Sequence, residues 1–180
     1  MTWTAPMTAV ANSTLTASQW NIHVRDNFNE TAPAKATTAG RIFVSTGANA
    51  IAEREPITAL TAANQTTTST SYTDLGGTPG PQASVATGTR AMVWWKARCW
   101  NSTATNSVLM SIDVSGASTI AASDTIALVN TIGGTALAES QCQFHFFDTL
   151  TAGTNTFTAK YRVDASTGNF IDRRLMVIPL

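Results

Sequence analysis

Residues 90–100 read RAMVWWKARCW and alternate between two kinds of side chain without a break. Successive side chains of a β-strand point to opposite faces, so this period of two predicts a strand whose faces differ. Such a strand needs neighbouring strands to be stable, which makes this region part of a β-sheet. One of its faces is entirely small or apolar, and we expect it to lie in a hydrophobic core: Ala91, Val93, Trp95, Ala97 and Cys99.

The opposite face of the same strand combines large apolar side chains with cations: Met92, Trp94, Lys96, Arg98 and Trp100. Trp, Met and Arg are enriched at protein interfaces, and exposed aromatic side chains are costly for a monomer. We therefore favour a subunit interface on this face. Two alternatives stay open. In the first, this face is solvated and the aliphatic stems of Lys and Arg cover the indoles. In the second, Trp94 or Trp100 stacks on a sugar.

Other short segments of strand character recur through the C-terminal two thirds of the chain, separated by Gly, Asn, Asp and Pro. They cover residues 71–75, 107–114, 124–132, 140–148, 155–163 and 173–180. Strands this short and this regularly punctuated are typical of an all-β fold, and we predict an antiparallel β-sandwich or jelly roll over residues 66–180.

Alternation within these segments predicts further core faces. It groups Val108 with Met110, Ile112 and Val114, and it groups Phe157 with Ala159, Tyr161 and Val163. In residues 140–148 we assign the apolar series Cys142, Phe144 and Phe146 to the core, which turns His145 outward. The last strand ends in LMVIPL and is apolar on both faces, as expected of a central strand or one buried between subunits.

A short amphipathic helix is predicted near the N-terminus, over residues 16–29. Thr16 followed by Gln19 forms a capping box, and Asn29 is a suitable end before Pro33. Leu15 before the cap and Trp20 inside the helix have the spacing of a hydrophobic staple.

The same helix presents Trp20, Val24 and Phe28 at a spacing of four residues, which places them on one face. A helix of about a dozen residues is marginal alone in water. We therefore expect this face to pack either on the β domain of its own chain or on a partner or symmetry copy.

These predicted elements divide the chain into three zones. Residues 1–33 form an N-terminal anchor, and residues 66–180 form the β head. The segment of residues 34–65 has small and polar residues at both of its ends. We interpret it as a linker that contains a short β-hairpin near residues 41–51.

Composition argues against several functional classes. Charged residues are 12% of the chain, the net charge is zero, and the basic residues form no cluster, so we expect no nucleic-acid partner. No apolar run approaches the ~18 residues of a membrane span, and no secretion signal is visible, so we expect no membrane partner and folding in a cytoplasm. Cys99 and Cys142 lack metal-ligand spacing. We favour buried free thiols over a single disulfide.

Residues that could carry catalysis are sparse. His23 and His145 have no partner close in sequence, and the aspartates are scattered singly near strand ends. No G-x-S-x-G, P-loop, dinucleotide fingerprint or C-x-x-C is present. We expect no catalytic site, no metal and no cofactor.

The opening residues TWTAPMTAVANSTLTASQWNIHVRDNFNE resemble the start of a family of tailed-phage virion proteins common in actinobacterial phages and prophages. The shared elements are Trp3, Thr16-Ala17, Trp20-Asn21 and the run Val24-Arg25-Asp26-Asn27. The segment AGRIFVSTGANAIAER is similar to a small repeat of phage tail and fibre proteins. TTTSTSYTDL and the final NTFTAKYRVDASTGNFIDRRLMVIPL are similar to the C-terminal sandwich domain behind that opening.

This resemblance implies a non-enzymatic virion protein, made in the host cytoplasm, that forms a homotrimer with an N-terminal anchor and a β head. It favours a tail fibre or minor tail protein slightly over a capsid decoration protein or head fibre, with other virion proteins and a host-surface glycan as partners. The alternative is a carbohydrate-binding β-sandwich module. We predict these anchor residues: Trp3, Leu15, Trp20, Val24, Arg25 and Phe28.

Overall fold

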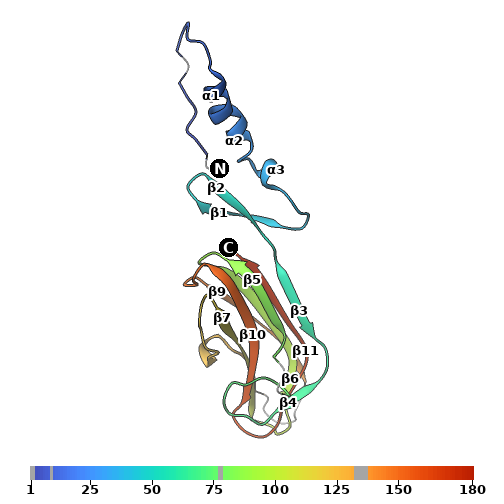
Figure 1. Ribbon diagram of the computed structural model, residues 1–180. Helices are drawn as coiled ribbons and strands as arrows, with labels where there is room; N and C mark the ends of the chain where they lie inside the picture. Colours follow the sequence, from blue (N-terminus) through green and yellow to red (C-terminus); the bar gives the residue numbers. More distant parts are fainter. Residues whose placement is uncertain (1–2, 9, 77–78, 132–137) are drawn as a thin grey trace. The chain divides into compact units, whose positions relative to one another are not determined.

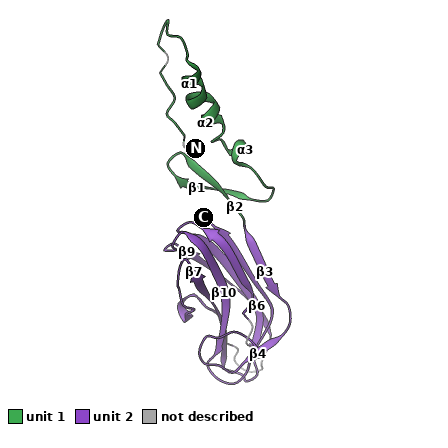
Figure 2. Ribbon diagram, viewed as in Figure 1, with its two compact units in different colours: residues 1–55 green, residues 56–180 purple. Residues whose placement is uncertain are grey.

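The computed structural model describes residues 3–8, 10–76, 79–131 and 138–180 (Figure 1). The chain divides into two compact units, Met1–Glu55 and Pro56–Leu180 (Figure 2). Unit 1 holds the helical segment and one hairpin, whereas unit 2 is built from strands.

The predicted N-terminal helix is present in unit 1 and runs through three consecutive elements. They are α1 (Ala17–Trp20), the π-helical turn η1 (Asn21–Arg25) and α2 (Asp26–Phe28). The capping box is confirmed. The Gln19 amide donates to Thr16 Oγ1 at 3.2 Å, and the Thr16 amide donates to Gln19 Oε1 at 2.9 Å. Asn29 is the C-cap, as expected.

The chain turns after Asn29 and forms a further helical turn, α3 (Ala32–Lys35), with Pro33 in its first turn. Proline suits this position because the first amides of a helix have no intrahelical acceptor. Pro33 therefore starts a second short helix and does not only end the first.

The predicted hairpin of unit 1 consists of β1 (Ile42–Gly47) and β2 (Ala50–Arg54), joined through a tight turn. Asn49 adopts a φ of +55° in that turn, a conformation that asparagine tolerates well. Glu53 of β2 accepts hydrogen bonds from the Thr37 amide at 2.6 Å and the Thr37 hydroxyl at 2.7 Å, so the segment after α3 is tied to the hairpin.

The strands of unit 2 that the structure describes form two antiparallel sheets. One has the order β3-β11-β6-β9 with β4 added beside β11, and the other has the order β5-β10-β7-β8. The bounds are β3 Ile57–Thr61, β4 Gln65–Thr67, β5 Gln82–Thr87, β6 Ala91–Asn101, β7 Ser107–Gly116, β8 Leu128–Thr131, β9 Glu139–Phe147, β10 Gly153–Val163 and β11 Gly168–Pro179. A 3₁₀ turn, η2 (Asp124–Ile126), precedes β8.

The pairing of these strands defines a jelly roll. Strand β3 pairs with β11, β5 with β10, β6 with β9, and β7 with β8. Apart from the short β4, the first strand thus meets the last, the second meets the next to last, and so on inward, as in one long hairpin rolled into two sheets. The predicted all-β sandwich is therefore confirmed.

The core of unit 2 lies between the two sheets and contains most of the predicted residues. The inward faces of β6, β7 and β10 are buried as expected, and Trp95 Nε1 donates to the Met110 carbonyl at 3.1 Å. Phe147, Phe170, Leu175 and Val177 complete this core from β9 and β11. Strand β11 is central in its sheet, as the apolar sequence of its end suggested.

The prediction for β9 is wrong by one residue. Phe144 and Phe146 are 44% and 39% exposed, and Cys142 is also exposed. His145 instead points to the inner side, where its ring meets Phe147 edge-on at 4.6 Å between centroids. The error arises because aromatic side chains occupy the outer face of this sheet, so the more apolar series is not the buried one.

Three strands, β3, β4 and β5, lie where the sequence predicted a linker or no strand. Strand β3 falls in the predicted linker of residues 34–65, yet it pairs with β11 from Ile57 to Thr61. Strand β5 pairs with β10 and buries Ala83 and Val85. Both are rich in small residues, which weakened their strand signal. Conversely, residues 71–75 form no continuous strand, but they contribute an isolated bridge from Thr73 to Tyr161 and the buried side chain of Leu75. Position 132 of the predicted segment 124–132 lies outside the described residues.

Candidate docking surfaces

An extended segment runs beside the helix of unit 1 and is held by one side chain. The Thr4 amide donates to Asn27 Oδ1 at 2.9 Å, and Asn27 Nδ2 donates to the Thr4 carbonyl at 2.9 Å. The same Nδ2 also donates to the carbonyl of His23 at 3.0 Å. Asn27 is the buried residue of this helix, and the sequence analysis did not select it. Its only signal in the sequence is its place in the run VRDN.

His23 takes part in the same arrangement. Its Nδ1 lies 3.1 Å from the carbonyl of Ala5, one residue beyond Thr4. Two polar side chains of the helix, Asn27 and His23, thus contact the backbone of the extended segment. The aromatic side chains of the helix, Trp20 and Phe28, stay exposed.

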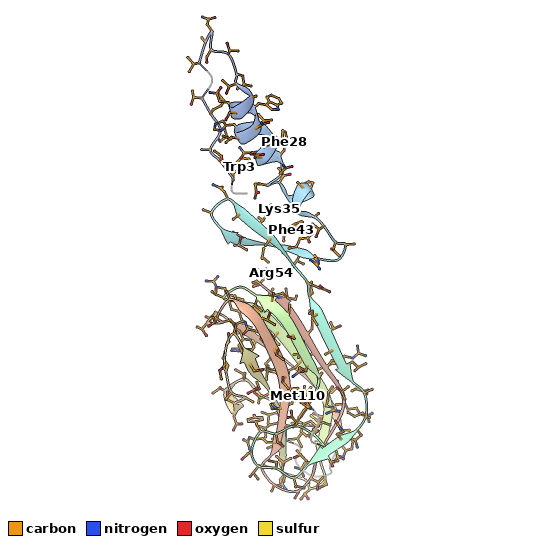
Figure 3. The ribbon with its side chains drawn as sticks, viewed as in Figure 1. Trp3, Phe28, Lys35, Phe43, Arg54 and Met110 are labelled. Atoms are coloured by element: carbon orange, nitrogen blue, oxygen red, sulfur yellow. The ribbon has the colours of Figure 1, made fainter. Side chains whose placement is uncertain are left out.

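Seven large apolar side chains among the described residues of unit 1 are exposed, and four of them lie in the helix or next to its cap. We call these four the unit 1 apolar set: Leu15, Trp20, Ile22 and Phe28. Trp20 is 53% exposed and Phe28 is 68% exposed, and Phe28 is labelled on the helix in Figure 3. A short helix is stable only when its apolar face is covered. Trp20 and Phe28 of the predicted stripe are therefore exposed, whereas Val24 is half-buried beside the extended segment.

The remaining predicted anchor residues are Trp3, Val24 and Arg25. Trp3 lines a hollow with Glu30 and the tip of the β1-β2 hairpin, and Figure 3 labels it on the extended segment. Val24 is half-buried and lines a second hollow, of about 420 Å³, with the extended segment. Arg25 pairs with its neighbour Asp26 at 2.7 Å. The predicted anchor thus divides into the half-buried Val24, a local ion pair at Arg25, and exposed apolar side chains that include Trp3.

A second apolar surface covers the outer face of the β3-β11-β6-β9 sheet in unit 2. Strand register places Trp94 directly opposite Phe144 on one side and Met176 on the other. The next row joins Phe146, Met92 and Ile178 in the same way. We call this surface the outer apolar face and define it by Leu60, Met92, Trp94, Phe144, Phe146, Met176 and Ile178.

The rings at the centre of this face contact each other. The indole of Trp94 and the ring of Phe144 have centroids 4.8 Å apart and an interplanar angle of 42°. This tilted contact fixes both side chains over the sheet while leaving Phe144 partly exposed. The predicted Met92 and Trp94 belong to this face, whereas the residues from β3, β9 and β11 were missed.

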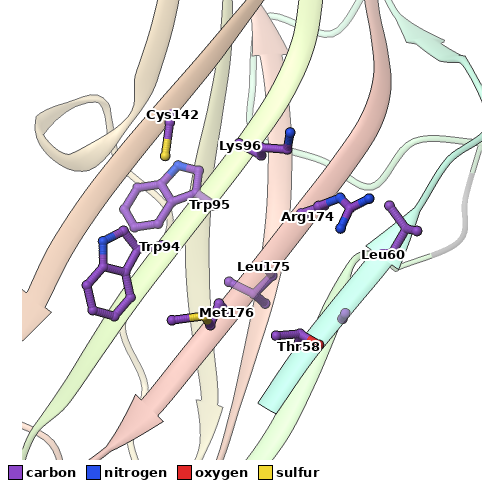
Figure 4. Close-up of a pocket in the computed structure, with 10 residues that line it drawn as sticks. Thr58, Leu60, Trp94, Trp95, Lys96, Cys142, Arg174, Leu175 and Met176 are labelled. Carbon is purple, nitrogen blue, oxygen red and sulfur yellow. The ribbon is translucent and has the colours of Figure 1, made fainter. Parts of the chain in front are cut away.

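A shallow groove of about 280 Å³ crosses the same face (Figure 4). Trp94 and Met176 line it together with the side chains of Lys96, Arg174 and Leu60, and Cys142 lies at its β9 side. Lys96 and Arg174 are direct partners in the β6-β11 register. Two cations thus face one apolar groove, and no acidic residue lines it.

The other two predicted residues of β6 extend the face toward its far end. Arg98 is exposed and lies opposite Ser140 and Ile171, and Trp100 is half-buried opposite Asn169. Neither lines the groove. The aromatic centre of the surface is therefore at Trp94 and Phe144, not at Trp100.

The second sheet presents a polar outer face. Its outward positions include Ser84 and Thr156, whose hydroxyls are 3.1 Å apart, and Lys160, whose ammonium donates to Asp74 at 2.8 Å. Val129 is the exposed large apolar residue on this side. The two sheets therefore differ sharply, and the apolar surface of unit 2 is concentrated on one of them.

In unit 2, Asp124 and Cys99 have pKa values that are shifted by hydrogen bonds or by burial. The pKa of Asp124 is lowered because its carboxylate accepts hydrogen bonds from Arg162 and from the Tyr72 hydroxyl. Burial raises the pKa of the Cys99 thiol to about 12, which makes it unreactive. Cys99 and Cys142 are free, as favoured, but Cys142 is exposed and not buried.

The buried guanidinium of Arg173 uses only some of its hydrogen-bond donors. Arg173 lies on the inner side of β11, with its guanidinium 5.5 Å from the centre of the Tyr161 ring. Its Nη2 donates to Gln65 Oε1 at 2.6 Å and to the Ala63 carbonyl at 3.2 Å. Its Nε and Nη1 have no hydrogen-bond partner among the residues that the structure describes.

The described part of the chain holds neither a metal-binding cluster nor a membrane-spanning helix. No group of three or more His, Cys, Asp or Glu side chains there could hold a metal ion. No helix among the same residues is long and apolar enough to span a membrane.

No protein-family model matches this sequence, and no curated protein matches it significantly. The functional argument therefore depends on the two surfaces and on the sequence itself.

Proposed function

We propose that this chain is a non-enzymatic structural component of a phage virion, in which unit 1 attaches the protein and unit 2 is the displayed head. The observation that carries the attachment role is the exposure of Trp20 and Phe28 on a capped helix that is tied to its own unit by hydrogen bonds of Asn27. Side chains of this size on a short helix favour a partner surface. We place the protein in a virion because its opening residues resemble those of tailed-phage virion proteins.

The head role is supported by the jelly roll of unit 2. Viral capsid proteins and lectins both use this architecture, and a fold alone does not choose between them. Within the virion, we favour a tail fibre or minor tail position slightly over capsid decoration or a head fibre. Host-surface adhesion is the function we assign to the head.

The experiment is to purify particles of the phage that encodes the chain and to locate the protein on them with gold-labelled antibodies against unit 2. We expect labelling of intact particles, at the tail more than at the capsid. Particles that carry no label and contain no peptide of this chain by mass spectrometry would refute the proposal.

A carbohydrate-binding module is the second candidate, and the groove beside Trp94 favours it. An indole, two cations and the hydroxyl of Thr58 meet there, which are groups that bind sugars with acidic substituents. Screening of the full chain against a panel of neutral and acidic glycans tests this candidate. Binding that is lost in Trp94→Ala while the oligomeric state is unchanged would favour it.

A further inference from the structure

We infer that unit 1 is a separate folding unit of low stability, which opens and closes while unit 2 stays folded, and that docking orders it. The separate opening concerns the chain in solution and holds wherever the protein is located. The docking step rests on the attachment role proposed above.

The hydrophobic core of the described residues lies in unit 2. Every member of the core cluster comes from this unit, and its large side chains Trp95, Tyr161 and Phe157 are at most 1% exposed. Among the described residues of unit 1, Val44 is the only buried apolar residue, and it is 9% exposed. Burial of apolar surface is the dominant favourable contribution to folding, so unit 2 carries most of the stability of the chain.

The large apolar side chains of unit 1 are exposed, whereas those of unit 2 are mostly packed. Those exposed in the described part of unit 1 come from its extended segment, its helix and its hairpin: Trp3, Val10, Leu15, Trp20, Ile22, Phe28 and Phe43. Folding of unit 1 therefore removes little apolar surface from water, and the hydrophobic effect favours its folded form only weakly.

Each element of unit 1 is also marginal by itself. The helix consists of four residues in α1, five in η1 and three in α2. Isolated helices shorter than ~12–15 residues are marginal in water, and a π-helical turn such as η1 is rare within a helix. The β1-β2 sheet has two strands, and an isolated hairpin of that kind is marginal as well.

The contacts that tie these elements together are polar. Lys35 Nζ lies 2.8 Å from Glu30 Oε2, and Arg41 Nη1 lies 3.5 Å from Glu53 Oε2. The cations of both pairs are partly exposed, so solvent and salt screen them and each pair contributes little to stability. The hydrogen bonds of Thr37 to Glu53 are likewise exposed.

The boundary at Glu55 and Pro56 thus separates a unit with a large core from a unit that has almost none. Parts of a protein that differ in this way open separately, and the weaker part opens far more often. Under the attachment role, the docking surface covers Trp20 and Phe28 and supplies the burial that unit 1 lacks. A partner that binds only the folded form stabilises it, so attachment and ordering of unit 1 occur together.

Hydrogen exchange of the full chain in solution, followed by mass spectrometry, tests the separate opening. We expect the amides of the β1-β2 ladder to exchange roughly a hundredfold faster than those of β6 and β10. Ile112→Val, which removes one methyl group from the core of unit 2, should speed exchange in β6 and β10 roughly fivefold and leave the β1-β2 amides unchanged.

The reciprocal variant is in unit 1. Val44→Ala should speed exchange of the β1-β2 amides roughly tenfold and leave β6 and β10 unchanged. Val10→Ala is the matched control, at a valine of the same unit that is 69% exposed, and it should change neither group of amides. Equal protection of the two units, or an effect of Ile112→Val on β1-β2 as large as on β6, would overturn the separate opening.

The docking step is tested by the same exchange measurement on purified particles. The β1-β2 amides lie outside the helix that carries Trp20 and Phe28, so their protection reports the order of unit 1 and not direct cover. We expect them to exchange at least tenfold more slowly in particles than in solution, and equal rates would overturn ordering by docking. Particles that hold no copy of the chain would refute the proposed function and the docking step together, whereas the separate opening is decided by exchange in solution.

Discussion

Asn27 binds the backbone of Thr4 through both ends of its amide, accepting from the Thr4 amide and donating to the Thr4 carbonyl, each at 2.9 Å. The side chain thus pairs with a distant residue as a neighbouring strand would. It holds the extended segment against the polar side of the helix, and the unit 1 apolar set remains exposed.

Asn27→Ala should release the extended segment. The substitution removes both hydrogen bonds and leaves the part-buried Thr4 groups unpaired, which costs roughly 1–3 kcal/mol. Hydrogen exchange of the Thr4 amide should become at least fivefold faster, while the amides of unit 2 are unchanged. Asn29→Ala at the helix end is the matched control, and an equal effect of both variants would contradict the role of Asn27.

Thr16→Ala should loosen the start of the helix. Loss of a threonine N-cap typically costs ~1 kcal/mol, and the reciprocal bond from Gln19 weakens with it. We expect lower helical signal in circular dichroism and about fivefold faster exchange of the Gln19 amide. Thr14→Ala, at an exposed threonine just outside the cap, should leave both readouts unchanged.

These two hydrogen-bonded features differ in how well the sequence predicted them. The capping box is local, so Thr16 and Gln19 could be identified from spacing alone. The Asn27 contact joins residues 23 positions apart, and no pattern indicates it. Strand alternation has a similar limit. It correctly grouped Cys142 with Phe144 and Phe146, but it could not say which face of the sheet is buried, because that depends on the partner strand β6.

The buried side chain of Arg173 in β11 gives a prediction about buried charge. Gln65→Leu removes the side-chain acceptor of Arg173 and leaves a buried guanidinium with the Ala63 carbonyl alone, so unit 2 should lose roughly 1–3 kcal/mol of unfolding free energy. Arg173→Met should cost less, since replacing a buried charge by an apolar side chain of similar length is often neutral. Urea denaturation followed by tryptophan fluorescence measures both. A larger loss in Arg173→Met than in Gln65→Leu would show that the guanidinium is favourable where it lies.

Acid should weaken unit 2 partly through Asp124. The folded pKa of this carboxylate lies below its usual range because Arg162 and Tyr72 donate hydrogen bonds to it. Its stabilisation is therefore present above the unfolded pKa of about 3.9 and is lost as the pH falls through the lower folded pKa. The melting temperature of Asp124→Asn should fall less than that of the wild type between about pH 4 and pH 2. Asp148→Asn should follow the wild type, and parallel curves for all three proteins would exclude this contribution.

Incorporation of full-length variants into particles tests the attachment role of unit 1 most directly. Under the proposed virion function, a phage that carries this gene is grown with Trp20→Ser/Phe28→Ser, with Val129→Ser or with the wild type, and the amount of the chain in purified particles is measured by quantitative mass spectrometry. We predict at least a tenfold loss for Trp20→Ser/Phe28→Ser, with normal incorporation of Val129→Ser and a normal amount of folded protein in the lysate. Equal incorporation of all three proteins would contradict attachment through the exposed helix residues.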